Sequence, residues 1–299
     1  MYGLEKCKLC ARNCGVDREA GKVGVCGQTS ELVVARAALH MWEEPCISGE
    51  NGSGAVFFSG CNIGCVFCQN QNIAKGDVGK KISLERLVEI FFELEQKGAN
   101  NINLVTPTHY VPLIVEAIHR AREKGFSLPF VYNTGCYENL ETIQMLDGCI
   151  DIYLPDMKYK DSTMSMRYSH AKDYFTVASR ALEEMVRQVG EPVIDEKTGI
   201  MKKGVIVRHL LLPGGLMDSK EVVAYLYQTY HNKIFLSLMN QYTPLPQVAS
   251  FPEINRKVTR YEYNKLVNYA IELGVENGFI QEGNTAKESF IPEFDLEGV

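Results

Sequence analysis

The sequence predicts an α/β fold, and three observations support this. From about residue 51 onward, short apolar runs rich in Val and Ile alternate with amphipathic stretches. These runs are apolar on both faces, which is typical of strands in a parallel sheet covered by helices. Repeated βα units suit either an incomplete barrel or an open, doubly wound sheet. Both architectures place functional residues at the carboxyl ends of the strands.

Six segments have the length and composition of the expected strands. They are residues 55–59, 102–106, 130–133, 150–154, 205–211 and 234–238. A further short stretch, VIDEKTGIM, carries Lys-Thr-Gly at its centre and predicts a hairpin turn.

Helices are expected between these strands. One begins after Ser83 as N-cap and ends at Gly98, with apolar residues spaced three and four apart. The next has Pro112 in its first turn and Gly125 beyond its end. Three more are expected at residues 174–189, 219–230 and 259–273.

The first 50 residues differ from the rest of the chain. They are rich in Gly and Cys and show little periodicity, as in a small module held together by metal. We therefore expect a Cys-rich metal-binding module and linker at residues 1–50. Residues 51–299 are expected to form the α/β domain, with a helical segment at its C-terminus.

Composition excludes several classes of function. The chain of 299 residues has a formal net charge of −6 and a pI near 5.6, which argue against nucleic-acid or anionic-membrane partners. No apolar run reaches the roughly 18 residues that a membrane-spanning helix needs. The N-terminus lacks the layout of a signal peptide. We expect a cytoplasmic protein.

Cysteine usage points to metal or redox chemistry. The chain has ten cysteines, most of them in two close clusters, and a reducing compartment disfavours disulfides. Cys46, Cys136 and Cys149 stand alone and are expected to be small buried hydrophobes.

The first cluster to interpret is FFSGCNIGCVFCQN, where Cys61, Cys65 and Cys68 follow an apolar run in a C-x3-C-x2-C pattern. A [4Fe–4S] cluster held by three thiolates leaves one iron without a protein ligand, and that iron can bind a small molecule. The alternative is a zinc site with a fourth ligand such as His40.

Several motifs in order carry a family resemblance. The cysteine motif, with aromatic Phe67 before its third Cys, resembles the signature of the radical S-adenosylmethionine (radical SAM) superfamily. The wider strings GSGAVFFSGCNIGCVFCQN, NLVTPTHY, DIYLPDMKY, VIVRHLLLPG and LMNQYTP resemble one branch of it. That branch contains uncharacterised proteins related to pyruvate formate-lyase activating enzyme, with a Cys-rich N-terminal extension. The resemblance covers nearly the whole chain.

The resemblance implies a partial (β/α)6 barrel with the cluster in the loop after its first strand. It implies an enzyme in which a reduced [4Fe–4S] cluster cleaves S-adenosylmethionine (SAM) to give a 5′-deoxyadenosyl radical, which abstracts a hydrogen atom. The substrate would be a glycine of a partner protein, as for activating enzymes, or a small molecule or peptide. A reducing electron donor of the flavodoxin or ferredoxin type would be the other partner.

Two strand ends are candidate contacts for the amino group and ribose of SAM. In the superfamily the second strand usually ends in a Gly-Gly-Glu-like motif. This sequence has Thr-Pro-Thr there instead, with Thr106 and Thr108 and no carboxylate. Hydroxyls and carbonyls can still accept the ammonium protons. Asn133 and Thr134 end the third strand and are candidates for the methionyl part or the ribose.

Three other positions complete the predicted SAM site. Asp156 and Lys158 match an Asp-x-Lys element of the activating enzymes, in which Lys offers a charge to the SAM carboxylate. An exposed surface pair is the alternative. His209 is either a ligand near the ribose or a hydrogen-bonded core histidine, and Phe67 is expected near the adenine.

The second cysteine cluster has the pattern C-x2-C-x3-C-x11-C. Its members, Cys7, Cys10, Cys14 and Cys26, form a complete set of four soft ligands for zinc or an iron–sulfur cluster. The metal would either stabilise a segment too short to build its own core or act as an auxiliary cluster. Cys46 is either a stray thiol or a ligand that replaces one of these four.

A different class of function stays open at this point. The chain would then be a non-catalytic iron–sulfur electron carrier or a zinc-dependent binding protein. A large α/β domain argues against a simple carrier, which needs no barrel.

Overall fold

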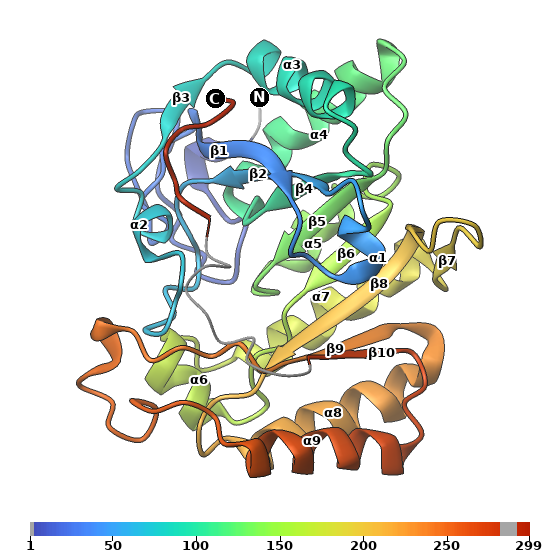
Figure 1. Ribbon diagram of the computed structural model, residues 1–299. Helices are drawn as coiled ribbons and strands as arrows, with labels where there is room; N and C mark the ends of the chain where they lie inside the picture. The colour runs from blue at the N-terminus through green and yellow to red at the C-terminus, as the bar shows by residue number, and fades with distance from the viewer. Residues whose placement is uncertain (1–2, 282–291) are drawn as a thin grey trace.

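The computed structural model describes residues 3–281 and 292–299, and a parallel sheet forms the centre of this part of the chain (Figure 1). Its strands lie in the order β2, β4, β5, β6, β8, β9 and β10, and each pair of neighbours is parallel. Their bounds are Ser53–Phe58 (β2), Ile102–Val105 (β4), Phe130–Thr134 (β5), Ile152–Pro155 (β6), Met201–Leu210 (β8), Phe235–Met239 (β9) and Gly278–Ile280 (β10). The six expected strands are confirmed, and β10 extends the sheet beyond them.

Two antiparallel strands extend the other edge of the sheet. β1 (Leu32–His40) pairs with β2 on one side and with β3 (Lys80–Ile82) on the other. The boundary expected at residue 50 is therefore too late for the sheet, because β1 already belongs to it. The predicted hairpin is confirmed: β7 (Val193–Ile194) pairs with the start of β8.

The chain ends beside β1 (Figure 1). The amide of Ala37 donates to the carbonyl of Glu297 at 2.8 Å, and Arg36 pairs with Asp295 at 2.7 Å. Phe294 meets Phe57 of β2 edge to face, with ring centroids 5.4 Å apart. The C-terminal segment thus covers part of the antiparallel edge.

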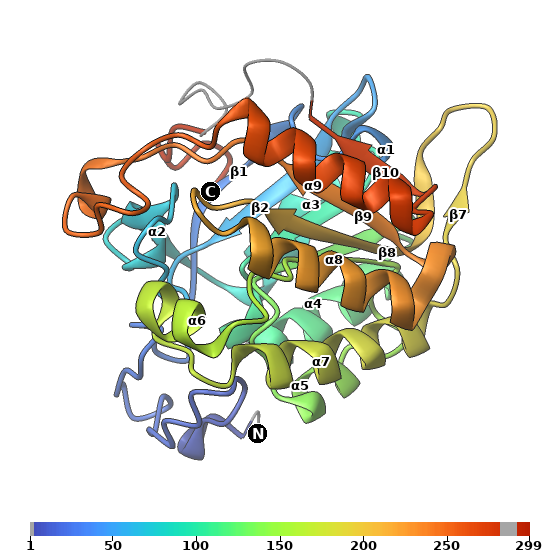
Figure 2. The same cartoon turned by 90° about the horizontal axis from the view of Figure 1, so that it is seen from below.

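Helices follow one another across the outer face of the sheet (Figure 2). Their bounds are Leu84–Gln96 (α3), Val111–Glu123 (α4), Leu140–Gln144 (α5), Ser162–Ser169 (α6), Tyr174–Val189 (α7), Leu216–Tyr230 (α8) and Arg260–Leu273 (α9), with short turns at Pro45–Ser48 (α1) and Gln71–Ala74 (α2). The five expected helices are confirmed, although α8 begins earlier than residue 219. A curved, open sheet with helices outside it is a partial barrel, as expected.

The main core lies between the sheet and these helices. Leu87 and Phe91 of α3 and Ile114 and Ile118 of α4 are buried against the strands on three- and four-residue spacings. Within the described residues, no helix combines the length and the apolar character needed to cross a membrane.

Residues 3–31 form an irregular segment that packs against the sheet through a buried arginine. Arg18 is fully buried and donates to the carbonyls of Gln28, Thr29 and His109. Gly60 lies where this segment meets the sheet. Its φ is +89°, and a Cβ there would lie 2.6 Å from the carbonyl oxygen of Cys26. Only glycine suits this position, because both the backbone conformation and the close approach exclude a side chain.

The start of α9 allows a test of the assigned helix boundaries. Thr259 accepts from the amide of Glu262 at 3.2 Å, and the Glu262 carboxylate accepts from the amide of Thr259 at 2.9 Å. Thr259→Ala removes this capping box and should lower the free energy of unfolding by about 1 kcal/mol in urea denaturation. Thr176→Ala, at an exposed helical position, is the matched control and should change it little. Equal values for the two variants would contradict the boundary.

Candidate functional site

A cavity of about 410 Å³ opens at the carboxyl ends of the parallel strands. Cys61, Cys65 and Cys68 line it from the loop after β2. The ends of β4, β5 and β6 contribute further lining residues: Val105, Thr106, Asn133, Thr134, Asp156 and Lys158. The three thiols of the motif therefore face the region where this fold class places functional groups.

Local hydrogen bonds fix the cysteine loop. The hydroxyl of Ser169, at the end of α6, donates to Sγ of Cys65 at 3.0 Å, and the amide of Ile63 donates to Sγ of Cys61 at 3.4 Å. Burial raises the pKa of the Cys68 thiol to about 12 and raises that of Cys65, while the Lys158 ammonium lowers both. An occupant that takes thiolates must therefore supply positive charge.

Among the described residues, no three or more His, Cys, Asp or Glu side chains are arranged to hold one metal ion, and this applies to the N-terminal cysteines as well as to Cys61, Cys65 and Cys68.

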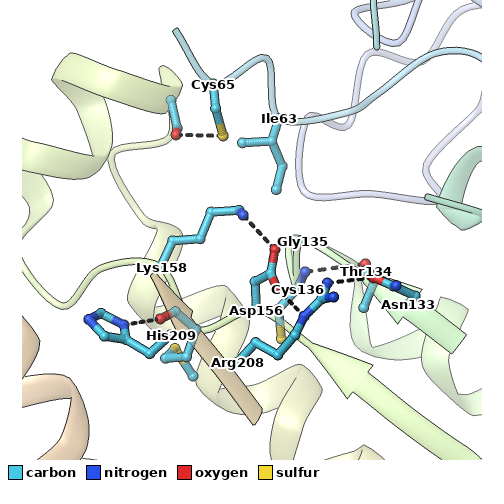
Figure 3. A network of polar contacts seen from close by, with 12 residues as sticks. Ile63, Cys65, Asn133, Thr134, Gly135, Cys136, Asp156, Lys158, Arg208 and His209 are labelled. Atoms are coloured by element: carbon cyan, nitrogen blue, oxygen red, sulfur yellow. Dashed lines mark hydrogen bonds and ion pairs between the residues drawn. The ribbon is translucent and has the colours of Figure 1, made fainter. Parts of the chain in front are cut away.

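Three charged side chains lie beside the cysteine loop (Figure 3). Nζ of Lys158 donates to Oδ2 of Asp156 at 2.6 Å, and Nε of Arg208 donates to Oδ1 at 2.9 Å. Burial alone would raise the pKa of Asp156, but Arg208 and Lys158 together hold it below its ordinary value. Asp156 is thus a carboxylate between two cations, and the Lys158 side chain points toward it on the Cys65 side of the network.

A glutamate from the segment between β1 and α1 completes this network. Oε1 of Glu43 accepts from Arg208 at 2.8 Å, and its Oε2 accepts from the side-chain amides of Asn103 and Asn133 at 2.7 and 3.1 Å. Nη2 of Arg208 also donates to Oδ1 of Asn133 at 2.6 Å. The linker is therefore joined to β4, β5 and β8 through buried polar groups.

The structure brings five of the eight predicted SAM-contact residues to the cavity. These are Thr106, Asn133, Thr134, Asp156 and Lys158. Thr106 has a φ of +56°, which is unusual for a β-branched residue and is held by a hydrogen bond from its amide to the carbonyl of Asn133. Asp156 and Lys158 are largely buried, so the alternative of an exposed surface pair does not describe them.

The other three predicted contacts do not line this cavity. The imidazole of His209 bonds the carbonyl of Met157 at 2.7 Å and the hydroxyl of Ser219 at 2.8 Å, and burial lowers its pKa to about 4 (Figure 3). His209 is therefore a hydrogen-bonded core histidine in this structure, the second of the two alternatives given for it above. Thr108 donates to buried Glu138 at 2.7 Å. Phe67 is buried, with its ring centroid 6.1 Å from that of Tyr242.

Glu43 and Arg208 are site residues that the sequence did not single out. Arg208 had a readable signal, since a charged residue inside an apolar strand needs a partner. The partner, Glu43, lies 165 positions away in an irregular segment, and no spacing rule connects the two.

A second cavity of about 600 Å³ adjoins the first. Both are lined by Trp42, Glu43, Arg208 and Gln241, so the polar network lies between them. Glu44 lines the second cavity, together with apolar side chains from the sheet edge: Met239, Phe279 and Ile280.

The four N-terminal cysteines lie in one module. Burial, with smaller contributions from the neighbouring thiols Cys26, Cys7 and Cys14, raises the pKa of Cys10 to about 12, although a hydrogen bond with the backbone of Arg12 opposes the shift. Sγ of Cys14 lies against Gly24, two residues before Cys26. Cys46 lies elsewhere, in an apolar cluster with Val131 and Ile152, so it is not placed as a replacement ligand. Cys136 and Cys149 are buried, as expected.

Comparisons with known proteins agree with this geometry. Residues 47–174 match the family described as a 4Fe–4S single cluster domain. An uncharacterised protein of Methanocaldococcus jannaschii, MJ0674, is 27% identical in an alignment of 277 residues that covers 89% of this chain and 75% of that protein.

Solved structures share the fold at low identity. SuiB of Streptococcus suis, bound to its precursor peptide SuiA, superposes with a TM-score of 0.50 over 75% of this chain at 13% identity. The protein anSMEcpe with bound AdoMet gives a TM-score of 0.50 over 72% of this chain at 14% identity. This chain spans about half the length of each, 47% of SuiB and 57% of anSMEcpe.

The matched 4Fe–4S single cluster domain spans the three-cysteine motif after the first parallel strand, and the chain shares its fold with SuiB and anSMEcpe.

Glu44 gives the site a pH dependence that can be measured. Burial raises its pKa from an ordinary value of 4.5 to about 7, with Glu43 and Asp156 adding to the shift and Arg208 opposing it. Between these values the folded chain holds a proton that the unfolded chain has lost, so stability falls as the pH rises from 4.5 to 7. Glu44→Gln carries no such proton. Its melting temperature should therefore rise relative to wild type between pH 4.5 and 8.

The control for this series is Glu196→Gln, at an exposed position in the β7–β8 hairpin. Its difference from wild type should stay flat with pH. If the Glu44→Gln difference is equally flat, Glu44 does not hold a proton in the folded protein.

Proposed function

We propose that this protein is a radical SAM enzyme whose [4Fe–4S] cluster is held by Cys61, Cys65 and Cys68. The observation that supports this most is that these three thiols line one cavity together with Asp156 and Lys158. When bound, the cluster and SAM supply an electron and a carbon-centred radical that abstracts a hydrogen atom from a substrate.

The residues present fit a cluster with one open position. Three thiols reach the cavity from a single short loop, and Ser169 offers a hydrogen bond to the sulfur of Cys65 at 3.0 Å. Such hydrogen bonds and the burial of the site influence the reduction potential of an iron–sulfur cluster.

The chain's own groups suit the polar parts of SAM. The Lys158 ammonium is a point charge for the SAM carboxylate, and Asp156 and Arg208 fix its direction. Thr106, Asn133 and Thr134 supply hydroxyls and carbonyls for the ammonium group and the ribose. These groups would orient SAM in the cavity.

The substrate is proposed to bind in the second cavity, which the polar network separates from the first. Gln241, in the loop after β9, lines both cavities and is the proposed substrate contact. By resemblance to the activating-enzyme branch, a glycine of a partner protein is one candidate substrate, and a small molecule or peptide is the other.

Two further features complete the proposal. The N-terminal module binds a second metal, zinc or an iron–sulfur cluster, through Cys7, Cys10, Cys14 and Cys26. A flavodoxin- or ferredoxin-type protein supplies the electron. We also propose that the chain divides into this N-terminal module and the barrel, and that the sheet of the barrel begins at β1.

The direct test is release of 5′-deoxyadenosine. Protein purified and reconstituted without oxygen, then reduced in the presence of SAM, should release 5′-deoxyadenosine, detected by chromatography and mass spectrometry. The electron-carrier or zinc-binding alternative predicts no release from a fully loaded cluster and no SAM-induced change in its EPR spectrum. The absence of both 5′-deoxyadenosine release and a SAM-induced EPR change would contradict the proposal.

The two metal sites are expected to be separable in one direction. Replacing Cys61, Cys65 and Cys68 together by Ala should remove one cluster and leave the N-terminal metal in place, because none of the N-terminal thiols is altered. Elemental analysis of the triple variant checks this and identifies the remaining metal as iron or zinc. Loss of all metal would show that the division into two sites is wrong.

A further inference from the structure

Arg12 of the N-terminal module binds the loop that carries the cluster cysteines. Arg12 lies between Cys10 and Cys14 in the sequence. Its Nε donates to the carbonyl of Asn62 at 2.8 Å, and its Nη2 donates to the carbonyl of Ile63 at 2.7 Å. Both acceptors lie between Cys61 and Cys65.

The same guanidinium also binds the end of helix α6. Nη2 donates to the carbonyl of Ser169 at 2.9 Å, and Nη1 donates to the carbonyl of His170. Ser169 is the residue whose hydroxyl donates to Sγ of Cys65. One side chain therefore joins the loop to the segment that supplies a hydrogen bond to a cluster ligand.

The position of Arg12 is fixed from behind. Its guanidinium stacks over the ring of Tyr137, 5.1 Å from the centroid. The side-chain amide of Asn62 donates to the carbonyl of Tyr137 at 2.8 Å, and Cys10 forms a backbone bridge with Glu138. Module, loop and the segment after β5 thus meet at this arginine.

We propose that Arg12 is a positioning residue that couples the N-terminal cysteine module to the cluster-binding loop. A guanidinium has five N–H donors in a fixed plane, and four of the hydrogen bonds they can make are used here to hold two separate segments. Ligation of Cys10 and Cys14 fixes the backbone on both sides of Arg12, so loss of the N-terminal metal weakens the hold of Arg12 on the loop without removing its four hydrogen bonds. By linkage this coupling is reciprocal in free energy, but replacing the loop cysteines removes none of the module's own ligands. This inference rests on the proposed cluster at Cys61, Cys65 and Cys68.

The first test uses chelator-treated protein and needs no activity. Rates of iodoacetamide alkylation at Cys61 and Cys65 are measured peptide by peptide with mass spectrometry. Arg12→Ala should raise both rates about tenfold or more, because the hydrogen bonds that close the loop are lost. Arg12→Lys keeps the charge but cannot reach four carbonyls. Its alkylation rates should lie between those of wild type and of Arg12→Ala. Rates equal to wild type in Arg12→Ala would overturn the proposal.

Two controls separate a loosened loop from a loosened protein. Cys136 is fully buried in the core, and its alkylation in Arg12→Ala should stay as slow as in wild type. If the alkylation rate of Cys136 rises by the same factor, Arg12→Ala loosens the whole protein rather than the cysteine loop, and the proposal fails. Arg120→Ala, which removes an arginine bonded to Glu85 and Glu116 on the surface, should leave all three rates unchanged.

The coupling is tested with Cys14→Ala, at an exposed thiol of the module. After reconstitution this variant should lose the N-terminal metal and show a smaller SAM-induced change in the EPR spectrum than wild type. A full SAM-induced change would overturn the coupling. If wild type releases no 5′-deoxyadenosine while the Arg12 alkylation difference holds, the proposed function fails and the positioning role stands. If wild type releases 5′-deoxyadenosine but Arg12→Ala shows no alkylation difference, the proposed function stands and the positioning role of Arg12 fails.

Discussion

The buried side chain of Arg208 is the constraint on which the open end of the barrel depends. It reaches from β8 to Asp156 after β6, to Asn133 on β5 and to Glu43 in the segment before α1. A buried charge is tolerated only when it is paired, and removing one partner from such a pair costs about 3–5 kcal/mol. The pairing therefore fixes the relative positions of three strands and the linker. It also sets the direction of Asp156, which in turn holds Lys158 on the side of Cys65.

This constraint explains why the charged groups of the site form a network rather than separate contacts. Arg208 and Lys158 share one carboxylate, so a ligand that takes the Lys158 charge also changes the balance at Arg208. Glu43 and Arg208 lie between the two cavities, and Glu44 lines the second one. The wall between the proposed SAM and substrate positions is therefore polar and nearly balanced in charge. The charge of a substrate in the second cavity would therefore affect the electrostatic environment of SAM in the first.

Much of the barrel could be predicted from the sequence, because buried parallel strands are short runs of Val, Ile and Leu. The cysteine motif and Asp156 and Lys158 could be predicted as well, since they directly follow such runs. The antiparallel strands β1 and β3 could not, because their pairing depends on neighbours far along the chain. The same holds for Glu43 and for Arg12, whose partners lie more than 40 positions away. For His209 both readings were open, and only the structure shows that Met157 and Ser219 occupy both ring nitrogens.

The central claim is that the cluster held by Cys61, Cys65 and Cys68 keeps one iron open and that SAM binds it. The most direct measurement is electron–nuclear double resonance on the reduced, reconstituted protein with SAM labelled by ¹⁵N in its amino group and ¹⁷O in its carboxylate. Direct ligation predicts hyperfine coupling of both labels to the cluster. A loaded and reduced cluster with no coupling to either label would contradict the account.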